Sequence, residues 1–395
     1  MVNKKMRALG AVRSEIREIF EYGQKRKAEI GKDNVFDFSL GNPSVPAPDS
    51  VTAGLSSLIS ECLPVTLHAY TSAQGDASVR RAVIEYINKT HGVNYTADAL
   101  YMTVGAAAAL TATLTAVVSP GEEVIVLAPY FPEYKVFIER CGGVVREVMS
   151  DPVTFQPDIN AIYDAINEKT AALIINSPNT PTGAVITEES VEALAELLSS
   201  CKEKYGKPIY LIADEPYREL VYDGAFVPFL PKYYDDTIVC YSYSKSLSLP
   251  GERIGYVLVP PECAESSDVY FAVCGAGRAL GYVCAPSMLQ RLIPMCLGDT
   301  SDISIYDKNR RLLLKELTSY GFTVVKPDGA FYLFMKAPCE SAKEFCEEAK
   351  KYELLLVPSD SFGCPGYVRI SYCVTTEQVE RALPAFKRLA DAYGL

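Results

Sequence analysis

The most constraining feature of this sequence is a regular alternation of strand-like and helix-like patterns through its middle. Short runs rich in β-branched and other apolar residues alternate with longer amphipathic stretches between about residues 106 and 260. Strands that are apolar almost throughout are typical of a parallel sheet covered by helices on both faces. We therefore expect an α/β domain with strands at 123–127, 144–149, 172–176, 209–213, 237–242 and 254–259.

The pattern changes after about residue 280. Two helical stretches, 286–296 and 305–320, precede short strand-like runs and a final amphipathic helix at 376–392. This mixture predicts a second, α+β domain of roughly one hundred residues. At the N-terminus, a helix over 14–30 leads into a proline-rich loop that excludes helix. The expected parts are an N-terminal arm joining the small domain (1–48), a large domain (49–285) and a small C-terminal α+β domain (286–395).

Charge and cysteine content narrow the functional class. Lys and Arg total 38 against 49 Asp and Glu, a net charge of −11, whereas a nucleic-acid binder needs a cationic face for phosphates. The longest apolar stretch is too short to cross a bilayer, and the N-terminus lacks the apolar core of a signal peptide. The twelve cysteines form no C-x-x-C pair, and two histidines are too few for a histidine metal site. We expect a cytoplasmic protein with reduced thiols, no metal, and no nucleic-acid or membrane partner.

The most informative segment is Ser-Tyr-Ser-Lys at 242–245, followed by Gly251, Arg253 and Gly255. An isolated lysine with these neighbours is most simply a surface lysine beside a turn. Here, however, Lys245 follows a buried strand, and the carboxyl ends of such strands form the ligand crevice of α/β sheets. A partly desolvated lysine near an arginine has a lowered pKa and can form a Schiff base.

Three further segments carry polar groups at strand or helix ends. Asp214 and Tyr217 follow the strand at 209–213, where a carboxylate either caps a turn or pairs with a protonated heteroaromatic nitrogen. The stretch 176–183 is a polar turn after another buried strand. Gly105 opens a helix rich in alanine, whose free N–H groups suit a phosphate, although close helix packing explains the alanines equally well.

Together these segments resemble the fold-type I pyridoxal-phosphate enzymes, specifically the class I/II aminotransferases. The resemblance covers nearly the whole chain. It includes further family motifs: Tyr-x-x-x-x-Gly at 70–75, Pro-x-aromatic at 129–131, Pro-x-Gly-Ala-Phe-Tyr at 327–332 and Gly-Tyr-x-Arg-Ile-Ser at 366–371. It implies an α/β large domain with a mostly parallel seven-stranded sheet flanked by helices, plus the smaller α+β domain.

The resemblance also implies an activity and an assembly. The expected enzyme moves the amino group of an L-amino acid to a 2-oxo acid, with 2-oxoglutarate as the expected acceptor, through a Schiff base with pyridoxal 5′-phosphate in ping-pong half-reactions. Its active sites are shared in a homodimer. One subgroup of aspartate aminotransferases holds the distal carboxylate with a lysine at the position of Ala107, so aspartate specificity by that route is not expected here.

Roles for individual residues follow from the same resemblance. Lys245 holds the cofactor and then moves the substrate Cα proton. Asp214 keeps the pyridine nitrogen protonated, and Tyr217 donates to the phenolic oxygen. Phe131 stacks on the ring. Asn179 is expected to supply an amide to the cofactor and substrate, with the Thr180 hydroxyl as the alternative.

The remaining implied contacts concern the two anionic ends of the ligands. The phosphate cup is expected from the backbone of Gly105, Ala106 and Ala107, with Ser242 and Arg253, and Tyr70 reaching across from the neighbouring subunit. Arg369 is expected to hold the substrate α-carboxylate as a bidentate fork. Gly41 lets the N-terminal segment close over the substrate.

Three other functions compete with this interpretation. A carbon–sulfur β-lyase on the same fold needs the same cofactor residues. A pyridoxal-phosphate-sensing regulator carries an appended DNA-binding domain, for which we see no room before the N-terminal arm. A nicotinamide-dependent dehydrogenase needs a strand followed by G-x-G-x-x-G, and no such segment is present.

Overall fold

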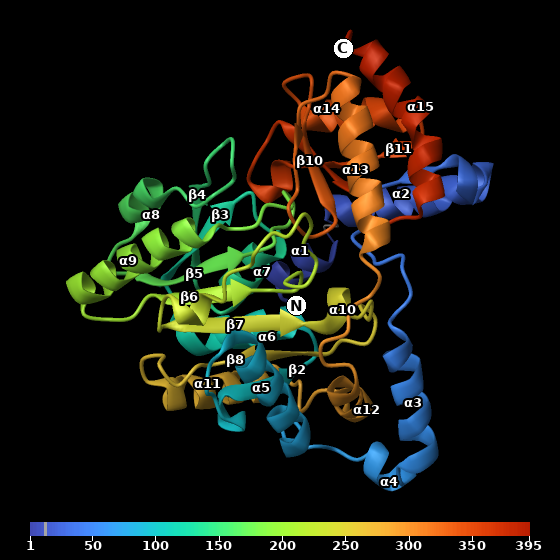
Figure 1. Ribbon diagram of the computed structural model, residues 1–395. Coiled ribbons are helices and arrows are strands. Elements are labelled where there is room, and N and C mark those ends of the chain that lie inside the picture. The colour runs from blue at the N-terminus through green and yellow to red at the C-terminus, as the bar shows by residue number, and fades with distance from the viewer. Residues whose placement is uncertain (12–13) are drawn as a thin grey trace.

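The computed structural model describes residues 1–11 and 14–395; residues 12–13, within the expected N-terminal arm, lie outside the described residues. A seven-stranded sheet forms the centre of the larger part (Figure 1). β8 runs antiparallel to both neighbours, and the other neighbouring pairs are parallel. The predicted fold class is thus confirmed. The strand order is β2 (Leu100–Thr103), β8 (Gly255–Leu258), β7 (Thr237–Ser242), β6 (Tyr210–Asp214), β5 (Thr170–Asn176), β3 (Glu123–Ala128) and β4 (Val144–Met149).

Helices cover both faces of this sheet because each face is apolar. One face packs against α6 (Ala106–Val117), α7 (Glu133–Arg140) and α11 (Ser266–Ala279). Small residues allow the close approach on this side: a Cβ at Gly277 would lie 2.0 Å from the hydroxyl oxygen of Tyr101. The core on the other face contains side chains of α5 (Ala77–His91), α8 (Ile159–Ala165), α9 (Glu188–Tyr205) and α12 (Ser287–Leu292), and α3 (Asp49–Glu61) joins this core beside α12.

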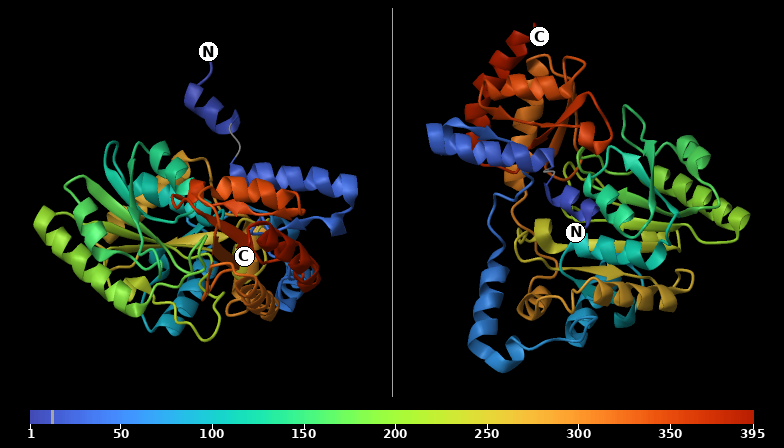
Figure 2. Two further views of the ribbon diagram at one scale, coloured as in Figure 1. Left: turned by 90° about the horizontal axis from the view of Figure 1, so that it is seen from above. Right: turned by 180° about the vertical axis from the view of Figure 1, so that it is seen from behind.

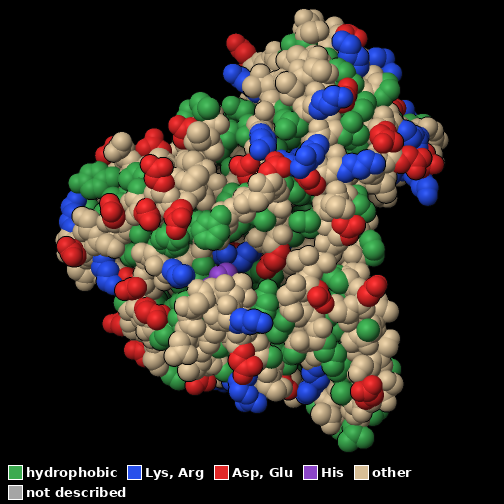
Figure 3. Space-filling view, viewed as in Figure 1, with side chains coloured by type: hydrophobic (Ala, Val, Ile, Leu, Met, Phe, Trp, Pro, Cys, Tyr) green, Lys and Arg blue, Asp and Glu red, His purple; other side chains and the backbone are tan. Residues whose placement is uncertain are grey.

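The C-terminal part has its own core. A four-stranded antiparallel sheet runs in the order β12 (Val357–Pro358), β13 (Tyr367–Ser371), β10 (Tyr332–Lys336) and β9 (Val324–Val325). Buried side chains of α13 (Ser304–Ser319), α14 (Ala342–Lys350) and α15 (Thr376–Ala392) pack with this sheet. In Figure 1 and in the view from behind in Figure 2 these elements lie together at one end of the molecule, which projects at the top of the space-filling view in Figure 3.

The N-terminal segment packs against this C-terminal part from residue 15 onward. After α1 (Lys4–Ala11) and α2 (Glu15–Ile30), β1 (Phe36–Asp37) pairs in parallel with β11 (Leu354–Leu355). The chain then passes to α3, which extends downward in Figure 1 toward α4 (Pro64–Leu67). Residues 38–41 link the two parts, because the Phe38 amide donates to the Leu355 carbonyl and the Gly41 carbonyl accepts from Lys245, which follows β7. Among the described helices, none has the length and apolar character needed to cross a membrane.

Candidate active site

A cavity of about 360 Å³ lies where the large sheet, the N-terminal segment and the small sheet meet. Parallel strands end at a common edge, and the register sets Asn176 beside Asp214 and Asp214 beside Cys240. Most of the predicted site residues line this one cavity: Gly41, Ala106, Ala107, Phe131, Asp214, Tyr217, Ser242, Lys245, Arg253 and Arg369.

Lys245 lies in the short helix α10 (Tyr243–Ser246), directly after β7. Ser242 caps this helix by accepting a hydrogen bond from the Ser244 amide at 3.1 Å. The Lys245 Nζ donates to the carbonyl oxygen of Gly41 at 2.7 Å. Burial lowers the pKa of Lys245 to about 8, and the positive charges of Arg253 and Arg369 contribute to the lowering. The lysine is therefore far more often neutral at physiological pH than an exposed lysine.

Asp214 ends strand β6 and is 5% exposed. Its Oδ2 accepts a hydrogen bond from the Tyr134 hydroxyl, and its Oδ1 has no hydrogen-bond partner in the described part of the chain. Burial raises the pKa of this carboxyl to about 7. A buried carboxylate with a free oxygen stabilises a cationic N–H donor placed next to it.

Tyr217 lies three residues beyond Asp214 and is also buried. Its hydroxyl oxygen lies 2.8 Å from that of Tyr332, close enough for a hydrogen bond. Burial raises the pKa of Tyr217 well above its usual value, so the phenol stays protonated and can donate. Phe131 contributes its ring to the same cavity and meets the Tyr134 ring edge-on at 5.7 Å between centroids.

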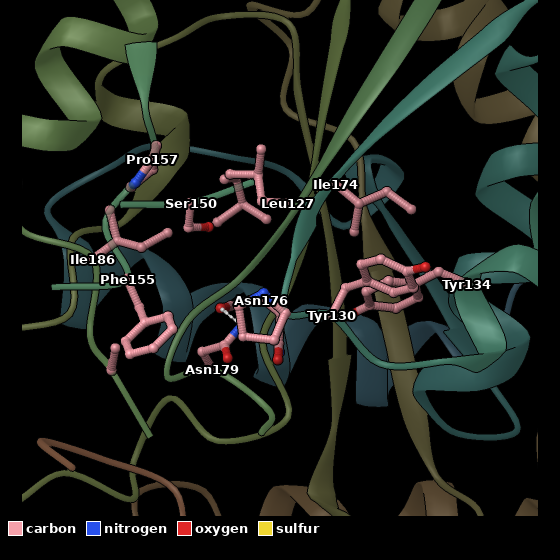
Figure 4. A pocket seen from close by; sticks show the side chains of 13 residues that line it. Leu127, Tyr130, Tyr134, Ser150, Phe155, Pro157, Ile174, Asn176, Asn179 and Ile186 are labelled. Atoms are coloured by element: carbon pink, nitrogen blue, oxygen red, sulfur yellow. Dashed lines mark hydrogen bonds between the residues drawn. The ribbon is translucent and has the colours of Figure 1, made fainter. Parts of the chain in front are cut away.

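Of the two neighbouring residues Asn179 and Thr180, only Thr180 lines the large cavity. The Thr180 Oγ1 is buried with no hydrogen-bond partner among the described residues. The Asn179 carboxamide is engaged within its own turn, where Oδ1 accepts from the Thr182 hydroxyl at 2.8 Å and Nδ2 donates to the Asn176 carbonyl. Asn179 lines a separate cavity of about 20 Å³, room for one water molecule, together with Tyr130, Tyr134 and Ser150 (Figure 4).

The start of helix α6 and Arg253 form a positively charged end of the cavity. The first bond of this helix runs from the Ala109 amide to the Gly105 carbonyl, which leaves the amides before Ala109 without helical acceptors. Gly105 has a φ of +86°, and a Cβ there would lie 2.8 Å from Arg253 Nη2. The guanidinium and the N-terminal end of the helix dipole are both positive and repel each other. An anion bound between them removes this repulsion.

Arg369 on β13 (Tyr367–Ser371) provides a second cation of the cavity, and this one is buried. It is 3% exposed, and Nη2 donates to the Ser39 carbonyl at 2.6 Å. Its guanidinium carbon lies 4.7 Å from the Tyr332 ring centroid and 5.2 Å from that of Phe362. Within the described residues the Arg369 Nε has no hydrogen-bond partner. The two aromatic rings therefore hold the Arg369 guanidinium in place, and N–H donors of this group remain available for a carboxylate.

Tyr70 lies outside the cavity that the described residues form. Its side chain is 88% exposed after the short helix α4, an unusual position for a tyrosine.

The structure also adds residues that the sequence reasoning did not assign. Tyr134 lies three residues after Phe131, so this spacing could have indicated a shared site. Tyr332 belongs to the quoted 327–332 motif but was given no role. Arg17 of α2 and Glu133 of α7 both line the cavity, and no sequence pattern indicated either of them.

Comparison with known proteins agrees with this geometry. The family model described as aminotransferase class I and II matches residues 33–386. An aspartate/prephenate aminotransferase of Thermus thermophilus is 32% identical over 335 residues, covering 81% of this chain and 83% of the relative. A crystal structure of an aminotransferase from Eubacterium rectale is 54% identical, with a TM-score of 0.98 and full coverage of both chains.

A second solved structure widens the comparison. The aspartate aminotransferase of Thermus thermophilus with maleate has a TM-score of 0.86 at 27% identity, and the match covers 98% of this chain and 99% of the other. The family match spans most of the chain, and the cavity lies at the strand ends where the family motifs meet. The chain therefore belongs to the class I and II aminotransferase family and is a pyridoxal-phosphate-dependent aminotransferase.

Proposed function

We propose that this enzyme transfers the amino group of an L-amino acid to a 2-oxo acid, with 2-oxoglutarate as acceptor, in two half-reactions at the cavity around Lys245. One observation carries the proposal. A single cavity holds an amine of lowered pKa, a buried carboxylate with a free oxygen, and a buried guanidinium with a free N–H. These are the groups needed to move a proton at Cα and to hold an α-carboxylate.

The donor set fits pyridoxal phosphate. The free amides at the start of α6, the Ser242 hydroxyl and the Arg253 guanidinium suit its phosphate. The free Asp214 Oδ1 suits its pyridine N–H. Tyr217 and Thr180, both lining the cavity, suit its phenolic oxygen. We assign the second of these contacts to Thr180 rather than Asn179, because the Asn179 carboxamide is engaged with Thr182.

When bound, pyridoxal phosphate supplies an electron sink for the electron pair left at the substrate Cα. Asp214 keeps that sink effective, since an ionised carboxylate beside the pyridine nitrogen holds a proton on it. Losing this carboxylate is expected to slow proton transfer much more than it weakens substrate binding.

Lys245 carries out the proton transfer. Its Nζ would take the proton from the substrate Cα, the carbon that bears the amino group. A pKa of about 8 leaves roughly one-tenth of the amine neutral at pH 7, compared with well under 1% for an ordinary lysine. Arg369 fixes the α-carboxylate as a fork, which orients the Cα–H bond toward the lysine. The same fork serves the carboxylate of the incoming 2-oxo acid.

Some of the relatives are aspartate aminotransferases, which supports an acidic amino acid as the amino-group donor. The side chain at position 107, however, is a methyl group that provides no cation for a second carboxylate. The preferred donor therefore has to be identified by assay across a panel of L-amino acids.

The test is the visible absorption of the purified enzyme as each L-amino acid is added without acceptor. Conversion of the carbonyl form of the cofactor to its amine form, reversed by 2-oxoglutarate, is the expected result and names the donor. Absorption that no donor changes reversibly would overturn the proposal. Release of pyruvate and ammonia from cystine without a 2-oxo acid would instead assign the chain as a β-lyase.

A further inference from the structure

We infer that Tyr134 is a positioning residue, which holds one carboxylate oxygen of Asp214 so that the other faces the pyridine nitrogen of the cofactor. The inference rests on the function proposed above and adds a residue to that site. Its basis is a hydrogen bond between two buried side chains from separate elements, α7 and β6.

The geometry leaves Tyr134 little freedom. It is 2% exposed, and its hydroxyl donates to Asp214 Oδ2. Its ring packs edge-on against Phe131, the residue expected to stack on the cofactor ring. The stacking face thus comes from the loop just before α7, and the group that orients the carboxylate comes from the first turn of α7.

The two oxygens of Asp214 have different surroundings. Oδ2 is occupied by Tyr134, whereas Oδ1 is buried with no hydrogen-bond partner among the residues described. The neighbouring Asn176 side chain does not compete, because its Nδ2 donates to the backbone carbonyl of Asp214 at 2.9 Å. With one oxygen fixed, rotation of the carboxylate is restricted and Oδ1 is presented to a ligand donor.

Tyr134 also affects whether Asp214 is ionised. Burial raises the pKa of Asp214, the Tyr134 hydrogen bond opposes this, and the adjacent Glu215 raises the pKa further. The other titratable groups near this contact, Tyr217 on the following loop and Cys240 on β7, are buried and neutral, with raised pKa values. Burial likewise raises the pKa of Tyr134 far above its usual value, so it remains a donor. Among these groups, Tyr134 is therefore the donor that favours the charged carboxylate.

The test compares Tyr134→Phe with a matched control, Tyr130→Phe. Tyr130 is equally buried, lies four residues earlier, and donates to Glu147 at 2.8 Å instead of Asp214. The measurement is the affinity of the apoprotein for pyridoxal phosphate from pH 6 to 8.5, followed by absorbance. We expect Tyr134→Phe to weaken binding about tenfold at pH 7 and to move the acid limb of binding to higher pH. Tyr130→Phe should do neither.

A double-mutant cycle separates positioning from simple packing. In an Asp214→Asn background, Tyr134→Phe should cause little further loss of cofactor affinity, because the carboxylate it acts through is gone. In the otherwise wild-type enzyme, kcat should fall while KM for the amino acid stays near its original value, since Arg369 is untouched.

The outcomes distinguish this inference from the proposed function. Equal affinity and equal pH dependence for the two phenylalanine variants would overturn the role of Tyr134, and so would losses that add fully in the double mutant. A wild-type protein that binds pyridoxal phosphate but transfers no amino group would overturn the proposed function. The comparison of cofactor affinities would still test the role of Tyr134 in that case.

Discussion

The Nζ of Lys245 lies 2.7 Å from the carbonyl oxygen of Gly41. This hydrogen bond joins the lysine at the end of the large sheet to the segment that crosses toward the small sheet. Gly41 is tightly enclosed at that point: a Cβ there would lie 2.1 Å from the Tyr332 hydroxyl oxygen and 3.1 Å from Phe331. The backbone of Gly41 therefore approaches the lysine only because it has no side chain.

Gly41→Ala is expected to displace the Tyr332 phenol and break its hydrogen bond to Tyr217. Overpacking of this kind costs about 1–3 kcal/mol of stability, and we expect kcat/KM to fall at least about tenfold through the misplaced phenols. Steady-state kinetics and thermal unfolding check both effects. The control is Gly275→Ala on the exposed side of α11, where a Cβ meets no described atom within 4 Å; it should stabilise by up to about 1 kcal/mol. Unchanged activity in Gly41→Ala would contradict the argument.

The lowered pKa of Lys245 predicts how fast the apoprotein takes up its cofactor. Only the neutral amine attacks an aldehyde, so the rate should rise about tenfold per pH unit up to about pH 8 and then level off. The check is stopped-flow absorbance after mixing apoprotein with pyridoxal phosphate between pH 6 and 10. N-α-acetyl-lysine, with an ordinary amine, should keep accelerating to pH 10. If the rate for the protein rises up to pH 10 as the rate for the free amine does, burial does not lower the pKa of Lys245. Lys245→Ala should form no borohydride-reducible adduct.

The sequence indicated the strands that contain runs of β-branched residues. The segments 144–149 and 237–242 match β4 and β7 at both ends. It did not indicate β2, an edge strand of four residues without a β-branched run, or α11, whose glycines at 275 and 277 lower its helical propensity. Tertiary packing explains why α11 forms in spite of these glycines, since the absence of a side chain at Gly277 leaves room for Tyr101.

Residues that line the cavity were predictable where a motif places a side chain at the end of a strand or just beyond it. Asp214, Ser242 and Lys245 follow this rule, because parallel strands end together. Contacts between distant segments were not predictable in this way. The carbonyl of Gly41 on Lys245 and the Tyr134 hydroxyl on Asp214 depend on how separate elements pack, and one sequence does not record that packing.

Arg253→Ala is expected to weaken binding of pyridoxal phosphate about tenfold or more, because a charge-assisted hydrogen bond contributes about 1.5–3 kcal/mol. The side chain is exposed, so the lower end of this range is expected, and the affinity of the wild-type enzyme should fall with added salt. Equilibrium titration of the apoprotein measures the effect. Pyridoxal without its phosphate is the control ligand, and it should bind the variant and the wild type alike. An equal loss for both ligands would show that Arg253 acts on the fold of the site instead of the phosphate.

Arg369→Lys should raise KM for the amino acid substrate about tenfold to a hundredfold while cofactor affinity stays unchanged. Lysine keeps the charge but loses the planar fork and its stacking between Tyr332 and Phe362. Steady-state kinetics across donor concentrations, together with a cofactor titration, separates the two effects. Arg388→Lys, an exposed substitution on α15, is the matched control and should behave as wild type. A fall in kcat with KM unchanged would place Arg369 in the chemical step instead of binding.

The exposure of Tyr70 is explained if its phenol completes the phosphate cup of a second copy, and subunit mixing tests this. Lys245→Ala and Tyr70→Ala homodimers should each have little activity. In a mixed dimer, the site that keeps Lys245 belongs to the Tyr70→Ala subunit and receives an intact Tyr70 from the other chain. Co-refolding the two inactive variants should therefore restore activity. In a random mixture the activity should approach one-quarter of the wild-type value, because half the dimers are mixed and each has one complete site.

Were Tyr70 to act within its own subunit, every site in the mixture would lack one of the two groups and activity would not return. Size-exclusion chromatography of each variant confirms that a dimer forms before the mixing result is read.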